Sequence, residues 1–496
     1  MSIETELKLR MTPEHLAKLR RHALFRKHQI TAPVTRRLYN VYYDTPKLQL
    51  QKNRMALRLR RVAGVWLQTL KGGGQVLGGL HQRHEWEVPV PSGSLDFSGL
   101  DESVWGEYLP AALRSDLQSV FITDFSRSSR LLEWQGAVIE VCMDHGVVKT
   151  DAQSTPICEV ELELKSGENR QLFELARALL DIVPFELEMV SKAELGYRML
   201  SGHIVQPVKG TIPKLVCPDR LTNGLQTLIW SCLQHLQGNL RGAMAGKDPE
   251  YLHQMRIALR RLRVVLRMAG KVCRDEELDS LRVEFSSLGA MLGSIREWDV
   301  FIDGLALLPE HAGLQVMREC SEMHRDECCA ALHMRARWLQ HLLLQLAIWM
   351  SGPYWQKAEN GAPYTCDFAA HHLNQLYRRY THTPLHGLDA ERLHELRIHA
   401  KKLRYSAEFF ACLFDAKKAR SFIAALGEVQ ETLGQINDIA VARRQLEKLT
   451  ANLAVDEGAI AFVGRSLDKK LSKKIKLLEK HAQVFDKRSA FWEIKG

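Results

Sequence analysis

The 496-residue sequence has no long apolar run, no Cys-x-x-Cys pair and few aromatic residues, which make up 7% of it. The most apolar short stretch, residues 341–350, is too short to cross a bilayer. The ten cysteines are scattered, so we expect buried, reduced thiols and no disulfide framework or structural zinc site. The first residues show no basic segment followed by an apolar one. We therefore expect no secretory signal, no membrane partner and a cytoplasmic location.

Two common catalytic motifs are also missing. The sequence contains no Walker-A loop and no Gly-x-Ser-x-Gly nucleophile elbow. These absences exclude a P-loop machine and a serine hydrolase of that type. If the protein is an enzyme, attack by a water molecule that a metal or a lysine orients is the simplest chemistry.

Positive charge is in excess but unevenly distributed. Lys and Arg total 68 against 58 Asp and Glu, which gives a net charge of +10 and a pI near 9.0. Residues 1–200 carry 26 basic and 25 acidic residues, so nine of the ten excess charges lie in residues 201–496. An anionic partner is therefore to be sought mainly for the second part of the chain.

Hydrophobic periodicity divides the chain near residue 200. Before it, apolar and charged residues alternate with period 2 and predict strands, whereas residues 13–28 and 169–182 have helical patterns. The predicted strands are residues 3–10, 56–61, 83–90, 138–144 and 158–165, with turn signals at 44–46, 72–74, 78–79 and 166–167. We predict an α+β domain with an antiparallel sheet over residues 1–200.

Residues 201–218, with three prolines and two glycines, are predicted to be a linker. After it the period becomes 3.6 and predicts an all-helical bundle over residues 219–490. The predicted helices are residues 220–245, 249–270, 275–292, 296–307, 313–350, 366–381, 390–413, 416–434, 437–452 and 456–485.

The helical part contains an internal repeat. Leu-His-Gln-Met-Arg-Ile begins at Leu252 and Leu-His-Glu-Leu-Arg-Ile at Leu393, an offset of 141 residues. The same offset matches Leu292-Gly293 with Leu433-Gly434, so it holds over about 50 residues. We predict two homologous helical units, at about residues 220–310 and 366–452.

Each repeat carries a basic stripe with the helical spacing i, i+3, i+7, i+10. The stripes are His253, Arg256, Arg260 and Arg263, and His394, Arg397, Lys401 and Arg404. Like charges at this spacing repel one another, and an anion would compensate them. A solvated basic face is the alternative. The stripes have almost no aromatic residues for base stacking, so a backbone-only polyanion such as polyphosphate fits better than nucleic acid, although binding to a duplex backbone stays open.

On these repeated His-x-x-Arg helices, residues 219–490 resemble the CHAD domain, a helical family named for its conserved histidines. The resemblance implies binding of inorganic polyphosphate in a basic groove between the two repeats. The first copy reads Arg296-Glu-Trp-Asp and the second Asn437-Asp-Ile-Ala, so the groove need not be strictly symmetric.

Five of the predicted strands carry carboxylates and cations on one face. In residues 3–10, for example, Glu4, Glu6, Lys8 and Arg10 alternate with apolar or neutral residues. An ordinary half-exposed sheet is one interpretation. The other is a sheet curled so that the charged faces line a lumen, where carboxylates hold Mg²⁺ or Mn²⁺ and cations clamp a phosphate chain.

The first 200 residues also resemble the CYTH superfamily, the triphosphate tunnel metalloenzymes. The resemblance rests on Glu4-Thr-Glu6-Leu-Lys8 and on further segments in family order. These are Tyr42-Tyr43-Asp44-Thr45-Pro46, Leu57-Arg58-Leu59-Arg60, Thr69-Leu70-Lys71, Arg83-His-Glu85-Trp-Glu87, Glu161-Leu-Glu163 and Ser191-Lys192-Ala193. It implies an eight-stranded antiparallel tunnel that hydrolyses triphosphates with a divalent metal.

The resemblance also implies roles for individual residues. The metal-binding carboxylates would be Glu4, Glu6, Asp144, Glu159, Glu161 and Glu163. The substrate clamp would be Lys8, Arg58, Arg60, Lys71, Arg83, Arg127 and Lys192, with Arg130 as the alternative to Arg127. Lys8, Lys71, Glu85 and Lys192 would act in catalysis. Cys142 stands between Glu140 and Asp144 on the charged face, where the alternation predicts an acidic residue.

The function predicted from both halves is metal-dependent hydrolysis of inorganic triphosphate, with polyphosphate bound by the helical domain. Thiamine triphosphate, nucleoside triphosphates, RNA 5′-triphosphate ends and adenylate cyclisation are alternatives within the same fold. A polyphosphate-docking protein without turnover and a nucleic-acid-binding protein are the alternatives outside it.

Overall fold

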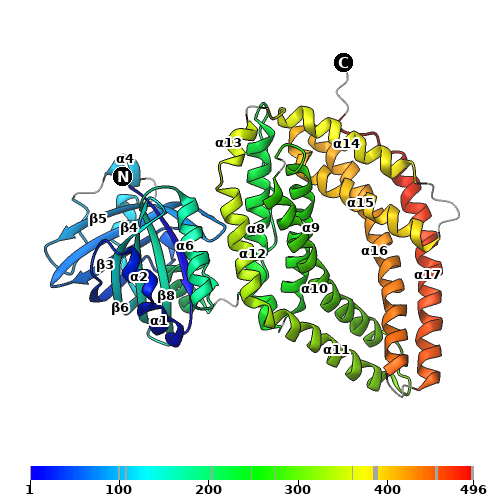
Figure 1. Ribbon diagram of the computed structural model, residues 1–496, viewed down its shortest axis with the longest axis horizontal. Coiled ribbons are helices and arrows are strands. Elements are labelled where there is room, and N and C mark those ends of the chain that lie inside the picture. Colours follow the sequence, from blue (N-terminus) through cyan, green and yellow to red (C-terminus); the bar gives the residue numbers. More distant parts are fainter. Residues whose placement is uncertain are drawn as a thin grey trace. The chain divides into compact units, whose positions relative to one another are not determined.

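A computed structural model describes the chain except residues 1, 99–100, 107–108, 203–204, 247, 274, 360, 384–388, 453–455 and 493–496 (Figure 1). The contacts divide the chain into two compact units. The first contains residues 1–206 and 337–352, and the second contains residues 207–336 and 353–496.

The first unit is built around a closed barrel of eight antiparallel strands. They are β1 (Ser2–Arg10), β2 (Val34–Asp44), β3 (Ala56–Val62), β4 (Val65–Leu77), β5 (Leu80–Val90), β6 (Gln118–Trp134), β7 (Ala137–Lys149) and β8 (Ser154–Ser166). Their order is β5-β4-β3-β2-β6-β7-β8-β1, and pairing of β1 with β5 closes the ring. The two-residue strand β9 (Glu186–Leu187) adds to β1. The predicted fold class is confirmed for this half.

The five predicted strands lie within β1, β3, β5, β7 and β8. The turn predicted at residues 72–74 is wrong, because β4 continues through these glycines with a bulge between Gly72 and Gly74. Gly74 has φ +107°, and a Cβ atom there would lie 2.1 Å from the carbonyl oxygen of Gln82. Glycine therefore permits a close approach of two strands here rather than a chain reversal.

Short helices cover parts of the barrel. They are α1 (Pro13–Arg20), α2 (Ala23–His28), α3 (Gln49–Lys52), α4 (Glu102–Trp105), α5 (Ala111–Arg114), α6 (Asn169–Ile182) and α7 (Lys192–Ser201). The single helix predicted over residues 13–28 is two helices, because the His22 side chain caps α2 by accepting from the amide of Leu24. Helix α6 has the predicted bounds and packs its buried apolar face against β1 and β8.

Asp44, in the Tyr-Tyr-Asp-Thr-Pro segment, is a structural residue. Its fully buried carboxylate accepts hydrogen bonds from the amides of Thr45, Leu50 and Gln51 and so fixes the start of α3. Asp44→Ala would leave three amides without an acceptor, so we expect it to lower the free energy of unfolding by about 3 kcal/mol. Urea unfolding would measure this loss, and an unchanged midpoint and slope would contradict it.

The second unit is all helical. Its helices are α8 (Leu221–Ala245), α9 (Pro249–Ala269), α10 (Glu276–Ala306), α11 (Leu314–Met334), α13 (Tyr354–Glu359), α14 (Thr365–Thr381), α15 (Ala390–Phe410), the 3₁₀ turn η1 (Ala411–Leu413), α16 (Ala416–Asn452) and α17 (Glu457–Asp486). Helix α9 packs on α8 and α10, and α15 packs on α14 and α16. The helices of the two repeats also contact each other, α10 with α16 and α9 with α15. The predicted all-helical architecture is confirmed.

Several predicted helix boundaries are wrong. The pairs 275–292/296–307 and 416–434/437–452 are the single helices α10 and α16, because an isolated glycine such as Gly293 or Gly434 does not end a helix that packs on both sides. The helix predicted at 313–350 is two helices, α11 and α12 (Ala336–Met350), which meet at Arg335. Helix α12 belongs to the barrel unit, where Gln340 accepts a hydrogen bond from the amide of Leu187.

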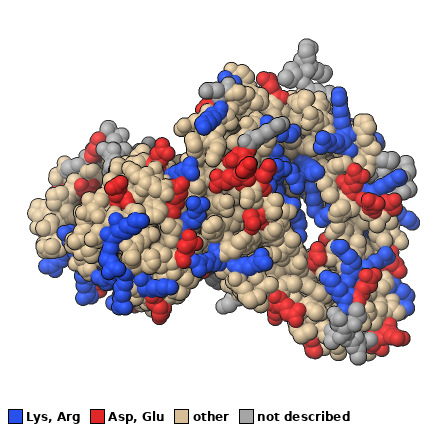
Figure 2. All heavy atoms as spheres, in the orientation of Figure 1, with Lys and Arg blue, Asp and Glu red and all other residues tan. Residues whose placement is uncertain are grey.

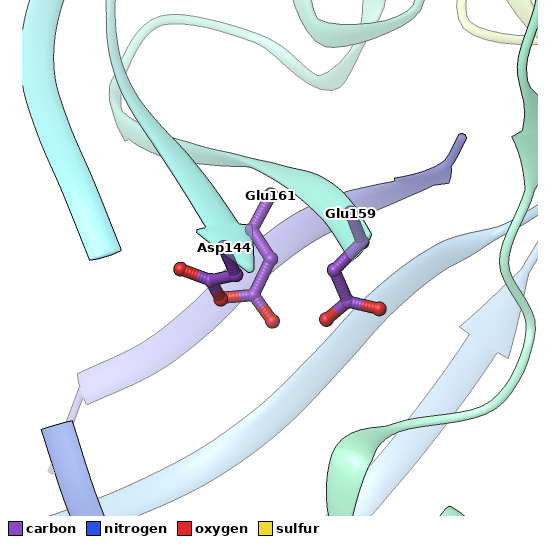
Figure 3. Close-up of side chains that lie close together, drawn as sticks. All are labelled: Asp144, Glu159 and Glu161. Atoms are coloured by element: carbon purple, nitrogen blue, oxygen red, sulfur yellow. The ribbon is translucent and has the colours of Figure 1, made fainter. Parts of the chain in front are cut away.

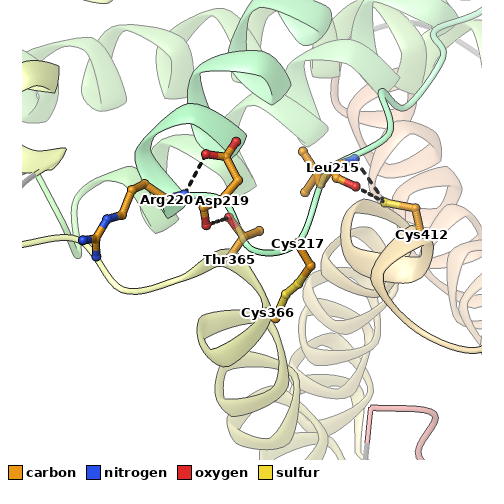
Figure 4. The surroundings of a disulfide bond; sticks show 7 residues. All are labelled: Leu215, Cys217, Asp219, Arg220, Thr365, Cys366 and Cys412. Carbon is orange, nitrogen blue, oxygen red and sulfur yellow. Dashed lines mark hydrogen bonds between the residues drawn. A yellow bond between two sulfur atoms is a disulfide. The ribbon is translucent and has the colours of Figure 1, made fainter.

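Part of the predicted linker packs against the helical unit (Figure 4). The amide of Val208 donates to Asn239, and the amide of Leu215 donates to the Sγ atom of Cys412. Cys217 forms a disulfide with Cys366, so the expectation that all ten cysteines are reduced is wrong for this pair. The backbone explains the pairing, because Thr365 donates to the carbonyl of Asp219 and holds the two segments side by side. The other eight cysteines are free, and one of them, Cys412, is exposed.

None of the helices in the described part of the chain combines the length and the apolar character that a membrane span requires.

Candidate functional site

The lumen of the barrel is a charged cavity of about 350 Å³. Side chains alternate along each strand, so residues two apart on neighbouring strands converge on this space. The acidic lining residues are Glu4, Glu6, Glu85, Glu87, Glu140, Glu161 and Glu163, and the basic ones are Lys8, Arg36, Arg58, Arg60, Lys71, Arg83, Arg127, Lys165 and Lys192. Nine cations thus face seven carboxylates, an excess of two positive charges.

Of the fourteen residues predicted for a site in this unit, twelve line the cavity. The other two, Asp144 and Glu159, are buried and form an acidic cluster with Glu161 (Figure 3). Strand register explains the cluster, because Asp144 of β7 lies opposite Glu159 of β8 and Cys142 lies opposite Glu161. One carboxylate oxygen from each of the three acids lies within 4.8 Å of the other two.

Lys192 lies among these three carboxylates. Its Nζ atom is 2.7 Å from Asp144 and 3.0 Å from Glu161, and it also contacts Glu159. Lys192 is the first residue of α7, whose N-cap is Ser191, so the start of a helix delivers the ammonium to the barrel. Although burial opposes the charge, the three carboxylates hold the pKa of Lys192 well above its ordinary value.

Lys8 makes a second buried bridge. Its Nζ atom is 2.9 Å from Glu6 and contacts Glu161. Burial raises the pKa of Glu6, but Lys8, Lys71 and His81 together outweigh it and the net effect lowers that pKa to about 2. The pKa of Glu161 also lies well below its ordinary value, because Lys192 and Lys8 outweigh its burial. Both carboxylates are therefore ionised at neutral pH.

The next acidic group along the lumen contains Glu4, Glu85, Glu140 and Glu163, each of which contacts a lysine. Lys71 contacts Glu4 and lies 3.2 Å from Glu85. Lys165 lies 3.0 Å from Glu140 and 2.6 Å from Glu163. Burial raises the pKa of Glu163 in spite of this contact.

Arginines from β3 and β6 form the cationic wall. Arg127 binds Asp144 through two nitrogens, at 2.8 and 2.6 Å, and also contacts Glu161. Arg60 donates to Asn40 at 2.8 Å. Burial, Arg58 and Arg127 lower the pKa of Arg60 to about 10, so its charge is poorly compensated. An anion in the lumen would supply that compensation.

The geometry also separates Arg127 from Arg130. Arg127 lines the cavity, whereas Arg130 lies against the ring of Phe25 in α2. Sequence reasoning did not assign roles to Arg36, Glu87, Glu140 or Lys165, which also line the cavity. The period-2 pattern of the predicted strands places Glu87, Glu140 and Lys165 on the charged faces, although the resemblance gave them no role. Arg36 lies on β2, where neighbouring charges hide the alternation.

The residues present suit a divalent cation with oxygen ligands. Asp144, Glu159 and Glu161 already converge, and Glu4, Glu6 and Glu163 add carboxylates within the same lumen. Carboxylate oxygens are the ligands that Mg²⁺ and Mn²⁺ prefer. Lys192 contacts all three acids of the cluster, so the cluster favours positive charge.

The two predicted basic stripes lie on α9 and α15. His253, Arg256, Arg260 and Arg263 of α9 and Arg397, Lys401 and Arg404 of α15 are half-buried, whereas His394 is exposed. The stripes approach each other, since Arg260 of α9 acts electrostatically on both Arg397 and Lys401. Arg296 of α10 joins the cluster beside Arg256, and Asp438 of α16 is a nearby acid. We call the surface formed by Arg256, Arg260, Arg296, Arg397 and Lys401 the basic groove.

Mutual repulsion marks the basic groove. Burial and the charges of Arg260 and Arg397 lower the pKa of Lys401 to about 6. Burial, Arg260 and Arg296 lower the pKa of Arg256 to about 10. Figure 2 shows Lys and Arg side chains gathered in the hollow of the helical unit. A groove whose own cations disfavour one another is suited to a polyanion.

Comparison with known families agrees with this architecture. Residues 2–197 match the CYTH domain and residues 227–447 match the CHAD domain. The chain therefore combines a CYTH domain, the charged barrel, with a CHAD domain, the repeated helical unit.

Individual relatives cover one half each. Over 199 residues, 39% of the chain, it is 36% identical to the inorganic triphosphatase of Haemophilus influenzae and covers 54% of that protein. The chain thus spans about half the length of this curated relative. The crystal structure of the CHAD domain from the plant Ricinus communis is 27% identical and has a TM-score of 0.52, covering 58% of this chain and 98% of that one. A Hippeastrum protein described as a putative adenylyl cyclase with a dominant triphosphatase activity is 18% identical, with a TM-score of 0.30 over 40% of this chain and 97% of that one.

Proposed function

We propose that the barrel hydrolyses inorganic triphosphate to pyrophosphate and phosphate with Mg²⁺ or Mn²⁺. The observation that carries the proposal is a closed lumen in which a buried carboxylate cluster adjoins a wall of arginines. The 36% identity to an inorganic triphosphatase over the same residues supports it.

The acidic and the basic residues of the lumen would have different roles. Arg58, Arg60 and Arg127 have planar forks that can clamp non-bridging phosphate oxygens. Asp144, Glu159 and Glu161 would hold the metal, which when bound supplies charge neutralisation for phosphoryl transfer and an activated water. Burial opposes the charge of Lys8 and of Lys192, but the neighbouring carboxylates raise the pKa of both, so both keep their protons. Together with Lys71 they can stabilise charge that develops on the phosphates. Glu85, 3.2 Å from Lys71, can orient that lysine.

The lining favours a substrate without a base or sugar. The cavity is dominated by charged side chains, and Trp66 and Trp86, which could have stacked on an organic group, are not among its described lining residues. Phe125 and Tyr42 do line it, but the ring of Phe125 is next to Lys192 and Arg127, and the ring of Tyr42 stacks on Phe121. These contacts leave phosphate oxygens as the main features to recognise.

A substrate comparison tests the proposal. The full chain would be given tripolyphosphate, ATP, thiamine triphosphate and long-chain polyphosphate with Mg²⁺ or Mn²⁺, and phosphate release would be measured. We expect tripolyphosphate to be hydrolysed fastest and chelation of the metal to stop the reaction. No turnover of any triphosphate would overturn the enzyme assignment, and preference for ATP or thiamine triphosphate would overturn the substrate assignment.

We also propose that the basic groove of the CHAD domain binds inorganic polyphosphate. Its cations come from both repeats and repel one another, so a chain of phosphates would relieve repulsion along its whole length. In the sequence of the two stripes, residues 253–263 and 394–405, Tyr405 is the one Phe, Trp or Tyr, which favours a polyanion without bases over nucleic acid.

Lys401 should make this binding depend on pH. The pKa of Lys401 is about 6 in the free protein, so its amine is mostly uncharged near neutral pH. Because polyphosphate favours the protonated amine, Lys401 takes up a proton when polyphosphate binds. We expect affinity to rise as pH falls from 8 to 6, by at most about tenfold per pH unit for one proton. Lys401→Arg stays charged throughout this range and should flatten the dependence. An equally steep dependence in Lys401→Arg, measured by titration calorimetry, would contradict this role.

A further inference from the structure

We propose that a three-arginine pocket between α9 and α10 binds a phosphate group, and that this group is the end of a polyphosphate chain lying in the basic groove. This inference rests on the proposed polyphosphate binding and extends the first stripe, at Arg263, to residues that the repeated stripes do not include, Arg267, Arg282 and Ser286. The pocket is defined by Arg263 and Arg267 of α9 and Arg282 and Ser286 of α10.

The pocket is an open cavity of about 440 Å³, large enough for a phosphate group and its first neighbours. Arg263 donates to the hydroxyl of Ser286 at 3.1 Å, and Arg282 donates to Asp279 at 2.8 Å. Within the described part of the chain, no hydrogen bond or ion pair is found for Arg267. Among the described residues that line the pocket, Asp279 is the one carboxylate beside three guanidinium groups, and only Arg282 of these contacts it.

Close packing holds Arg263 at the pocket wall. A Cβ atom at Gly289 would lie 3.0 Å from Nη1 of Arg263, so glycine leaves the room that the guanidinium takes on the surface of α10. Burial and the neighbouring charges of Arg263 and Arg282 lower the pKa of Arg267. The pocket therefore favours the binding of a negatively charged group, as the basic groove does.

The second repeat lacks this arrangement. The 141-residue offset places Glu408 where the first repeat has Arg267, Ile423 where it has Arg282, and Gly427 where it has Ser286. Arg404, the equivalent of Arg263, donates to Glu408 at 2.9 Å. The same carboxylate lies 3.4 Å from Arg261. In the second repeat the carboxylate of Glu408 thus compensates the charge of Arg404. In the first repeat the equivalent position is Arg267, so the charge of Arg263 is available to an anionic ligand.

Position along α9 connects the pocket with the groove. Arg256, Arg260, Arg263 and Arg267 follow the spacing i, i+4, i+7, i+11 on one helix, a stripe of about 16 Å. A linear chain that follows this stripe from the basic groove reaches the pocket at its end. Guanidinium groups bind tetrahedral phosphate oxygens through paired N–H donors, and Ser286 adds a hydroxyl. A phosphate group is therefore the ligand chemistry that the pocket matches.

Binding by the full chain tests the proposal. The double variant Arg267→Gln/Arg282→Gln would be compared with wild type for long-chain polyphosphate and, separately, for inorganic phosphate, by titration calorimetry. We expect the Kd for long-chain polyphosphate to rise about tenfold and its dependence on salt to become shallower. Arg420→Gln/Arg443→Gln, which removes the same charge from exposed positions of α16, should change neither. Circular dichroism and the Tm would establish that both variants fold.

The outcomes separate the pocket from the groove. If long-chain polyphosphate binds more weakly to the pocket variant but not to the α16 control, the result supports the chain end as the ligand of the pocket. Weaker binding of inorganic phosphate alone overturns the chain end and leaves a site for free phosphate. Unchanged binding of both, or equal weakening in the α16 control, overturns the pocket. If wild type binds no polyphosphate, the proposed function of the CHAD domain fails, and the inorganic phosphate measurement still tests the pocket.

Discussion

Glu161→Gln is expected to reduce triphosphate hydrolysis about a thousandfold. Glu161 contacts three cations of the lumen, Lys8, Arg127 and Lys192. It also belongs to the cluster with Asp144 and Glu159 that suits a divalent metal. The amide keeps the shape of the side chain but removes the negative charge, so both metal binding and the placement of three cations are lost. Phosphate release at saturating metal and the Kd for Mn²⁺ would be measured together.

Controls must separate chemistry from stability, because Glu161→Gln leaves three buried cations with less compensation. Asp124→Asn is the matched control, since Asp124 is in the same barrel and pairs with the highly exposed Arg37. Glu6→Gln is the second test variant, because Glu6 lines the same lumen and bridges to Lys8. Full activity in folded Glu161→Gln and Glu6→Gln would show that the metal assignment is wrong. Equal loss in Asp124→Asn would indicate a general effect of barrel stability.

Sequence periodicity predicted which side chains share a charged strand face because alternation is a local property, and the family resemblance implied that these faces line a tunnel. In β1, β3, β5 and β8 the residue parity alone assigns side chains to the inside of the barrel. The same reasoning could not determine how deeply each charged side chain is buried. Asp144 and Glu159 share the charged faces, yet they are buried behind the cavity around Lys192 rather than lining it. Depth depends on how α7 packs against the barrel, which is a tertiary contact that no strand pattern records.

Two other features also depended on contacts distant in sequence. The Cys217–Cys366 disulfide joins residues 149 positions apart, and scattered cysteines gave no spacing that could predict it. Helix α12 belongs to the barrel unit although it lies within the helical half of the sequence. By contrast, the 141-residue repeat predicted that α9 and α15 would present equivalent stripes, and the structure brings these stripes within electrostatic reach of each other.

Arg256→Gln/Arg397→Gln is expected to weaken polyphosphate binding about a hundredfold while leaving tripolyphosphate hydrolysis unchanged. The two arginines come from equivalent positions of the repeats, and Asp438 acts on both. Each is half-buried, and burial and the neighbouring charge of Arg260 lower the pKa of each, so each should form strong charge-assisted hydrogen bonds with phosphate. Removing both takes one contact from each side of the basic groove.

The measurement compares both halves of the same chain. Polyphosphate affinity would be measured by titration calorimetry at two salt concentrations, and tripolyphosphate hydrolysis by phosphate release. Arg420→Gln/Arg443→Gln again provides the control for a change of two charges on the surface of the CHAD domain. Unchanged polyphosphate affinity in Arg256→Gln/Arg397→Gln would remove the basic groove as the binding site. Loss of tripolyphosphate hydrolysis in the same folded variant would instead reveal that the CHAD domain contributes to the reaction in the barrel, since neither arginine belongs to the lumen.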